Sequence, residues 1–202
     1  MKYIKNMNVP NRLTMVRVLL IPLFVVFMCL SVKESQVQSL RLEASEHFIV
    51  MRWISVIVFG IASFTDFLDG NIARRKGLVS NFGKFMDPLA DKLLVCSALI
   101  LLSAEGSLPV WVVLLIIARE FIISGIRLVA SDNGVVIAAS KWGKLKTCSQ
   151  MLLCIVLILP TLSVRLGSVV IWLLIILATA LTLISLVDYI VKNKKVILEG
   201  GM

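Results

Sequence analysis

The sequence has few of the residues that build metal sites and disulfide frameworks in soluble proteins. It contains a single histidine, His47, and its four cysteines form no CxxC pair. This pattern is not that of a zinc site. The cysteines all lie in or beside apolar stretches, where we expect buried small hydrophobic residues; they are Cys29, Cys96, Cys148 and Cys154.

Charged residues are also scarce. They make up 16% of the 202 residues, and hydrophobic residues make up 59%, above the roughly 45–50% of soluble domains. This composition places the chain in a lipid bilayer. Because the charges fall between apolar runs rather than in a separate tail, we predict a single domain over residues 1–202. The net charge of +9 is typical of basic cytoplasmic loops and argues against nucleic acid as a partner.

We expect the first apolar run to be a membrane helix rather than a cleavable signal peptide, because no small-x-small cleavage pattern follows it. Apolar runs that approach the roughly 20 residues of a membrane span occur near residues 13–32, 50–73, 86–104, 109–130, 147–163 and 166–191. The predicted fold class is therefore all-α, a polytopic membrane protein with six transmembrane helices. Five is the main alternative count, because the third run contains acidic residues in its first turns.

The opening of the chain carries two further expectations. NVPNRLTMVRV is polar on one side and allows a short N-terminal interfacial helix before the first span. Pro22 predicts a kink or a break within that span. Ser31 to His47 mixes charges and is expected to be a long external loop.

The basic residues are distributed unevenly between the two sides of the predicted membrane. When the connecting segments are assigned to alternate sides, most lysines and arginines gather on one side. The other side receives only Lys33, Arg41, Arg52 and Arg165. By the positive-inside rule, both termini are expected to be cytoplasmic.

Four of the twelve acidic residues lie within 26 positions, in the segment DFLDGNIARRKGLVSNFGKFMDPLAD, residues 66–91. Helical residues three and four apart share a face. On the second helix that face carries Asp66, Asp69, Gly70 and Ala73, and on the third it carries Asp87 and Asp91 with Gly83 a turn earlier. A short connection makes neighbouring helices antiparallel. We therefore expect the four carboxylates to converge.

Converging carboxylates predict a metal site. Each acid at membrane depth costs about 2.5–3.5 kcal/mol on insertion scales, and like charges oppose joint ionisation. One or two Mg²⁺ or Mn²⁺ ions, which prefer oxygen ligands, would offset both effects. The alternatives are a solvated loop with ordinary surface charges and a cation or proton pathway. Pathway acids are usually spread across the membrane, whereas these are bunched.

Other residues of the same segment favour a phosphate-bearing ligand. Gly70 and Gly83 would let a flat ring or a diphosphate approach the backbone, although close helix packing also selects glycine. Arg74 can bind a phosphate with two parallel hydrogen bonds; its alternative is an interfacial positive charge. Ser80, in the connection, could donate one more hydrogen bond.

The spacing DxxDGxxAR, eight residues, then GxxxDxxxD resembles the signature of the CDP-alcohol phosphotransferase family, with all eight fixed positions filled. The opening NVPNRLTMVR resembles the start of the bacterial phosphatidylglycerophosphate synthases within that family. The resemblance implies a homodimer in the bacterial cell membrane, with a polar cavity open to the cytoplasm. It also implies transfer of a phosphatidyl group from CDP-diacylglycerol to an alcohol.

The resemblance further implies a role for each motif residue. The metal ions would be held by Asp66, Asp69, Asp87 and Asp91. Asp91 occupies the position of the general base. The donor would contact Asp69, Gly70 and Arg74, with Gly83 near the cytosine base, and we add Ala73 and Ser80 to this donor site.

A set of basic residues beyond the motif suggests the acceptor. Arg119 lies beside Glu120 in an apolar helix, where an arginine needs a partner or an anionic ligand; a structural pair or a snorkelling side chain is the alternative. With Arg127 and Lys141 it could bind a phosphate. Together with the resemblance of the opening, this favours sn-glycerol 3-phosphate over serine and inositol phosphate. The rival functions are an intramembrane prenyltransferase and a cation transporter.

Overall fold

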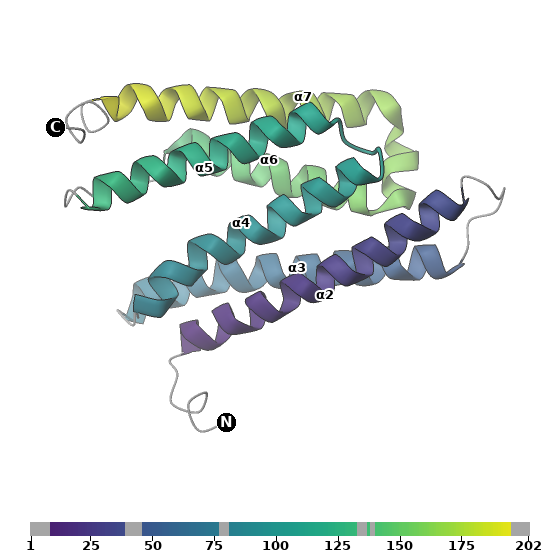
Figure 1. The fold of residues 1–202 in the computed structure, drawn as a ribbon, viewed down its shortest axis with the longest axis horizontal. Coiled ribbons are helices and arrows are strands. Elements are labelled where there is room, and N and C mark those ends of the chain that lie inside the picture. Colours follow the sequence, from purple (N-terminus) through teal and green to yellow (C-terminus); the bar gives the residue numbers. More distant parts are fainter. Residues whose placement is uncertain (1–8, 39–45, 77–80, 133–136, 138–139, 195–202) are drawn as a thin grey trace. The chain divides into compact units, whose positions relative to one another are not determined.

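The computed structural model describes residues 9–38, 46–76, 81–132, 137 and 140–194. Within these ranges the described side chains exclude those of residues 9–14, 33–38, 46, 66–76, 81–89, 91, 132 and 160. Helices are the only regular elements in the described part of the chain (Figure 1). They are α2 (Val9–Gln38), α3 (Glu46–Lys76), α4 (Asn81–Ala104), α5 (Val110–Asp132), α6 (Lys141–Ile158) and α7 (Pro160–Lys192). The predicted all-α class is confirmed.

The length and hydropathy of the helices are those of a membrane protein. Three windows among the described residues are long and apolar enough to cross a bilayer: Met15–Val32, His47–Thr65 and Thr161–Lys192. Lys92–Ala104 is a shorter apolar stretch of α4. The count of six spans stays a prediction.

The helices group into two compact units. The single domain expected from the sequence stays a prediction. Unit 1 is Met1–Glu105 with Ile158–Pro160 and contains α2, α3 and α4. Unit 2 is Gly106–Leu157 with Thr161–Met202 and contains α5, α6 and α7.

In unit 1, α2 packs against both α3 and α4 (Figure 1). Phe24 and Met28 of α2 are fully buried, and the Phe24 ring lies 5.6 Å from the ring of Phe59 on α3, centroid to centroid. Burial of large apolar side chains against each other supplies packing energy that the lipid tails alone do not. Arg17 is also fully buried in α2.

In unit 2, polar side chains join the three helices. Gln150 of α6 donates a hydrogen bond of 3.1 Å to the Thr182 hydroxyl of α7. The Arg119 Nε of α5 donates to the Ser185 hydroxyl of α7 at 3.2 Å. Hydrogen bonds between helices recur in membrane interiors, because an unpaired polar group in lipid is costly.

Glycine and proline determine where several helices end or break. Gly106 has a φ of 86° and ends α4 in the left-handed conformation that glycine adopts without strain. The helix predicted to run to residue 163 ends at Ile158, because Pro160 disfavours a helical residue before it. Gly167, with a φ of 74°, interrupts α7. The predicted start of the last span at residue 166 coincides with this break.

Three local expectations need correction. The opening from Val9 is the first part of α2 rather than a separate interfacial helix. Of the two alternatives expected at Pro22, the break is absent because α2 continues through this residue, and the kink stays a prediction. The predicted external loop from Ser31 to His47 is helical up to Gln38 and again from Glu46, because backbone hydrogen bonding continues beyond the apolar run. Residues 39–45 lie outside the described part of the chain.

The expectation of four buried cysteines is only partly correct. None of the four forms a disulfide; Cys154 is buried, Cys96 is half-buried, and Cys29 and Cys148 are exposed. The reason is that a lipid-facing helix surface is as apolar as a protein core, so apolar neighbours in the sequence do not separate the two environments.

Candidate active site

The motif lies on two helices at one end of unit 1. The positions of Asp66, Asp69, Gly70, Ala73 and Arg74 all fall in the last eleven residues of α3. Those of Gly83, Asp87 and Asp91 fall in the first eleven residues of α4. The end of α3 and the start of α4 lie at the same end of unit 1 (Figure 1).

This backbone confirms the premise of the sequence argument, which was helical spacing on both sides of a short connection. The alternative of a solvated loop is excluded for residues 66–76 and 81–91, because both segments are helical. The side chains of all these motif residues lie outside the described part of the structure, and so does Ser80 as a whole. Convergence of the four carboxylates therefore stays a prediction.

Several of the described residues that adjoin the acids are buried, whereas Phe64 and Leu93 are exposed. Ala90, immediately before Asp91, is fully buried, and Leu94 is 1% exposed. Thr65, immediately before Asp66, is buried and donates a hydrogen bond of 2.6 Å to the Ile61 carbonyl oxygen. Its hydroxyl is thus bonded within its own helix. Buried residues of unit 1 thus lie next to the motif on both helices.

The donor set suits a hard divalent cation. Carboxylate oxygens are the ligands that Mg²⁺ and Mn²⁺ prefer. The backbone positions of the four motif aspartates lie on two neighbouring helices. Among the described side chains, no three His, Cys, Asp or Glu residues gather, and the motif acids are not among those side chains. The residues of the motif therefore fit the predicted metal by their chemistry.

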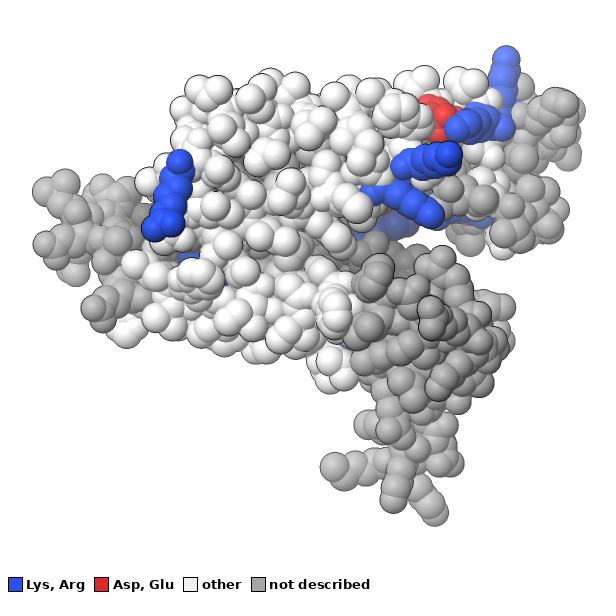
Figure 2. All heavy atoms as spheres, turned by 180° about the vertical axis from the view of Figure 1, so that it is seen from behind, with Lys and Arg blue, Asp and Glu red and all other residues white. Residues whose placement is uncertain are grey.

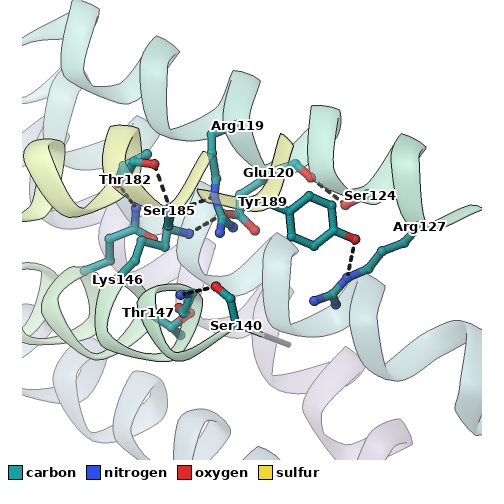
Figure 3. A network of polar contacts seen from close by, with 12 residues as sticks. Arg119, Glu120, Ser124, Arg127, Ser140, Lys146, Thr147, Thr182, Ser185 and Tyr189 are labelled. Carbon is teal, nitrogen blue, oxygen red and sulfur yellow. Dashed lines mark hydrogen bonds and ion pairs between the residues drawn. The ribbon is translucent and has the colours of Figure 1, made fainter. Parts of the chain in front are cut away.

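The predicted acceptor residues lie in unit 2, where Arg119 has partners (Figure 3). Arg119 is 8% exposed. Its Nη1 donates to Glu120 at 2.9 Å, and its Nε donates to Ser185. The structural pair that the sequence left as an alternative is therefore present. A role for Arg119 toward a phosphate stays a prediction.

Glu120 accepts from a second buried cation. Lys146 of α6, with a side chain only 3% exposed, forms an ion pair with the same carboxylate oxygen. Glu120 thus joins α5 to α6 while Arg119 joins α5 to α7 (Figure 3). The sequence did not reveal this network. One sequence pattern could have indicated a polar contact on this helix. Thr179, Thr182 and Ser185 occur at every third residue of an apolar helix, which predicts a polar stripe.

The first turn of α6 lies against Arg119. Ser140 caps this helix, since its hydroxyl accepts from the Gly143 amide at 3.0 Å, as N-cap serines do. A Cβ at Gly143 would lie 3.6 Å from Arg119 Nη2, an ordinary van der Waals contact, so the guanidinium lies close to the first turn of the helix. Helix N-termini attract anions.

Arg127 and Lys141 are both exposed. Arg127 donates from Nε to the Tyr189 hydroxyl at 3.3 Å, and its Cζ lies 5.7 Å from the centroid of that ring. The structure thus gives Arg119 and Arg127 different partners (Figure 3). Tyr189 was not anticipated from the sequence, because it lies 62 residues away on another helix.

Exposed basic residues gather at one end of unit 2. The end of α5, the start of α6 and the end of α7 carry Arg127, Lys141, Lys144, Lys192 and Lys194. Figure 2 shows lysine and arginine side chains close together at one end of a mostly uncharged face. Such a concentration of positive charge attracts anionic ligands.

Comparison with known proteins agrees with the motif. The family model for CDP-alcohol phosphatidyltransferase matches residues 7–196. A Bacillus subtilis (strain 168) protein named CDP-diacylglycerol–glycerol-3-phosphate 3-phosphatidyltransferase is 42% identical over 192 residues, which is 92% of this chain and 95% of the relative. A Rickettsia felis protein of the same name is 34% identical over 194 residues, 93% of this chain and 96% of the relative. The chain belongs to the CDP-alcohol phosphatidyltransferase family.

Proposed function

We propose that this protein transfers a phosphatidyl group from CDP-diacylglycerol to sn-glycerol 3-phosphate. The products are phosphatidylglycerophosphate and CMP, in phospholipid biosynthesis. The observation that carries the proposal is the complete motif on two neighbouring helices of unit 1, in a chain whose relatives are named for this reaction.

The motif residues divide the work of the reaction. Asp66, Asp69, Asp87 and Asp91 hold Mg²⁺ or Mn²⁺, which supplies positive charge against the donor diphosphate. Asp69, Gly70 and Arg74 contact the donor, together with Ala73, Ser80 and Gly83. In phosphoryl transfer most of the catalytic effect comes from positioning and charge stabilisation rather than from covalent chemistry. All of these residues except Ser80 have backbone positions on helices, which set a regular spacing between them.

Asp91 is the general base. It takes the proton from the acceptor hydroxyl as that oxygen forms a bond to the phosphorus next to diacylglycerol. The bond from this phosphorus to the bridging oxygen breaks, and the electron pair leaves with CMP. The new phosphodiester joins the phosphatidyl group to the acceptor.

The acceptor assignment rests on the basic residues of unit 2. Arg127 and Lys141 are exposed, and Arg119 lies against the N-terminal turn of α6. These groups suit a phosphate, which serine does not carry. The positive-inside pattern supports a cytoplasmic position for both termini and for the motif. The family resemblance supports a homodimer.

An acceptor panel tests the proposed function. With purified protein, CDP-diacylglycerol and Mg²⁺, CMP release should be fastest with glycerol 3-phosphate and should stop when the metal is chelated. Serine, inositol phosphate and plain glycerol are the comparison acceptors. Faster release with any of these would contradict the acceptor. No CMP release with any acceptor would contradict the reaction itself and favour a transporter or a prenyltransferase.

Arg127→Gln should raise the KM for glycerol 3-phosphate about 10- to 100-fold, since a hydrogen bond to a charged group contributes roughly 1.5–3 kcal/mol. The KM for CDP-diacylglycerol should not change. Arg165→Gln is the matched control, because Arg165 is an exposed arginine of unit 2 outside the basic end. Equal effects of the two substitutions on the acceptor KM would exclude Arg127 from the phosphate site.

A further inference from the structure

A buried ion pair lies at the end of unit 1 that is away from the motif. Arg52 of α3 is 2% exposed and pairs with Glu105, the residue after the end of α4. Arg52 Nη1 also lies 3.8 Å from Met28 Sδ of α2, and its Cζ is 5.2 Å from the Phe48 ring centroid. The guanidinium of Arg52 therefore contacts a side chain of α2 and the side chain of the residue that follows α4.

This ion pair has no part in the proposed chemistry. Asp66 follows Arg52 by 14 residues, which is about 21 Å along a helix at 1.5 Å per residue. Buried ion pairs are also poor stabilisers, because replacing both charges with apolar groups is often neutral or stabilising. Their best attested contribution is to select one register among several.

The pair connects α3 and α4 at positions equally distant from the motif. Asp91 precedes Glu105 by 14 residues, the same interval that separates Arg52 from Asp66. The two helices run in opposite directions (Figure 1). Equal intervals on antiparallel helices bring the backbone positions of Asp66 and Asp91 to the same level. Fourteen residues are also within about 40° of four whole helical turns, so each aspartate lies on nearly the same face of its helix as the ion-pair position.

The burial pattern along the two helices agrees with this register. Pairing Arg52 with Glu105 also pairs Ser55 with Leu102 and Phe59 with Ala98, all four of which are fully buried.

The same register pairs exposed residues with exposed residues. It matches Ile57, 56% exposed, with Ile100, 51% exposed. It also matches Phe64, 61% exposed, with Leu93, 47% exposed. Buried and exposed positions thus follow the same order along α3 and α4 when they are read in opposite directions. A shift by one residue would lose this correspondence.

We infer that Arg52 and Glu105 are positioning residues that fix the register of α3 against α4. They thereby keep the two halves of the motif at the same height along the helix axes. The inference rests on the proposed function in one respect, namely that Asp66 and Asp91 act in one site. An arginine in a membrane helix resists sliding, because any other register leaves its charge without the carboxylate.

The test compares three pairs of residues at positions 52 and 105. Arg52→Met/Glu105→Met removes both charges while keeping an apolar interior. Arg52→Gln/Glu105→Gln also removes both charges but keeps polar side chains, and it replaces the first variant in the test if that variant does not fold. Arg52→Glu/Glu105→Arg restores the pair in reverse. Arg165→Met is the matched control for loss of an arginine.

Spin labels at Phe64→Cys and Leu93→Cys report the register directly, in a background with the four native cysteines replaced. Both positions are exposed and flank the motif. We expect a narrow distance distribution by pulsed electron paramagnetic resonance in the parent protein and in the charge-reversed variant. The neutral variants should show a broader or shifted distribution.

Activity should follow the distances. The neutral variants should lose up to about 100-fold in kcat, as a displacement of about 1 Å at a reacting centre can cause, and should need more Mg²⁺ for half-maximal rate. The charge-reversed variant should recover both. An unchanged distance distribution in the neutral variants would overturn the inference, and so would a changed distribution with unchanged kcat and Mg²⁺ requirement. If the parent protein releases no CMP, the proposed function fails, and the distances still decide the register.

Discussion

Asp91→Asn is expected to lower kcat by about 100- to 10,000-fold, the usual contribution of a general base. Asparagine has nearly the same shape as aspartate but does not accept the proton of the acceptor hydroxyl. Three motif carboxylates remain to hold the metal, so Mg²⁺-dependent binding of CDP-diacylglycerol should be largely retained. Single-turnover CMP release and equilibrium binding of the donor measure the two quantities separately.

Two variants make this experiment specific. Asp66→Asn should weaken donor binding, because Asp66 is assigned to the metal alone. Asp188→Asn is the control, with the same chemical change at an acid paired to Lys192 at 2.6 Å in α7; its kcat should equal that of the parent protein. If Asp91→Asn bound donor no better than Asp66→Asn, the role of Asp91 would be limited to holding the metal, and its assignment as the base would be wrong.

Glu120→Gln is expected to destabilise the protein by about 3–5 kcal/mol, the usual cost of removing one partner from a buried ion pair. Its carboxylate faces two cations, Arg119 and Lys146, whose side chains are 9% and 3% exposed. Without the carboxylate both charges remain in a poorly solvated place. The midpoint of thermal unfolding in detergent should fall clearly below that of the parent protein.

Lys192→Ala provides the comparison for Glu120→Gln. Lys192 pairs with Asp188 one turn away, but its side chain is 60% exposed, and such surface pairs contribute about 0.3–0.5 kcal/mol. The unfolding midpoint of this variant should stay close to that of the parent protein. Equal midpoints for the two variants would show that the Glu120 network is not a major source of stability.

The sequence alone determined the class of fold and the motif, because both depend on local patterns. Apolar runs interrupted by charged segments predict membrane helices whatever their neighbours, and the described part of the chain contains six helices. The spacing of Asp66, Asp69, Asp87 and Asp91 identified the family without any contact being known. Helix ends were less accurate. Hydropathy detects only the apolar part of a helix, so it missed the extension of α2 to Gln38.

Only the tertiary structure decided which charges are partners. Lys146 follows Glu120 by 26 residues, and Glu105 follows Arg52 by 53. No local pattern joins residues so far apart, because their contact depends on how separate helices pack. The positive-inside rule counted Arg52 as an ordinary charge on one side of the membrane, whereas its side chain is buried. The charge of a segment determines which side of the membrane it prefers. The packing of the helices determines whether a charged side chain is solvated by water or paired with a carboxylate.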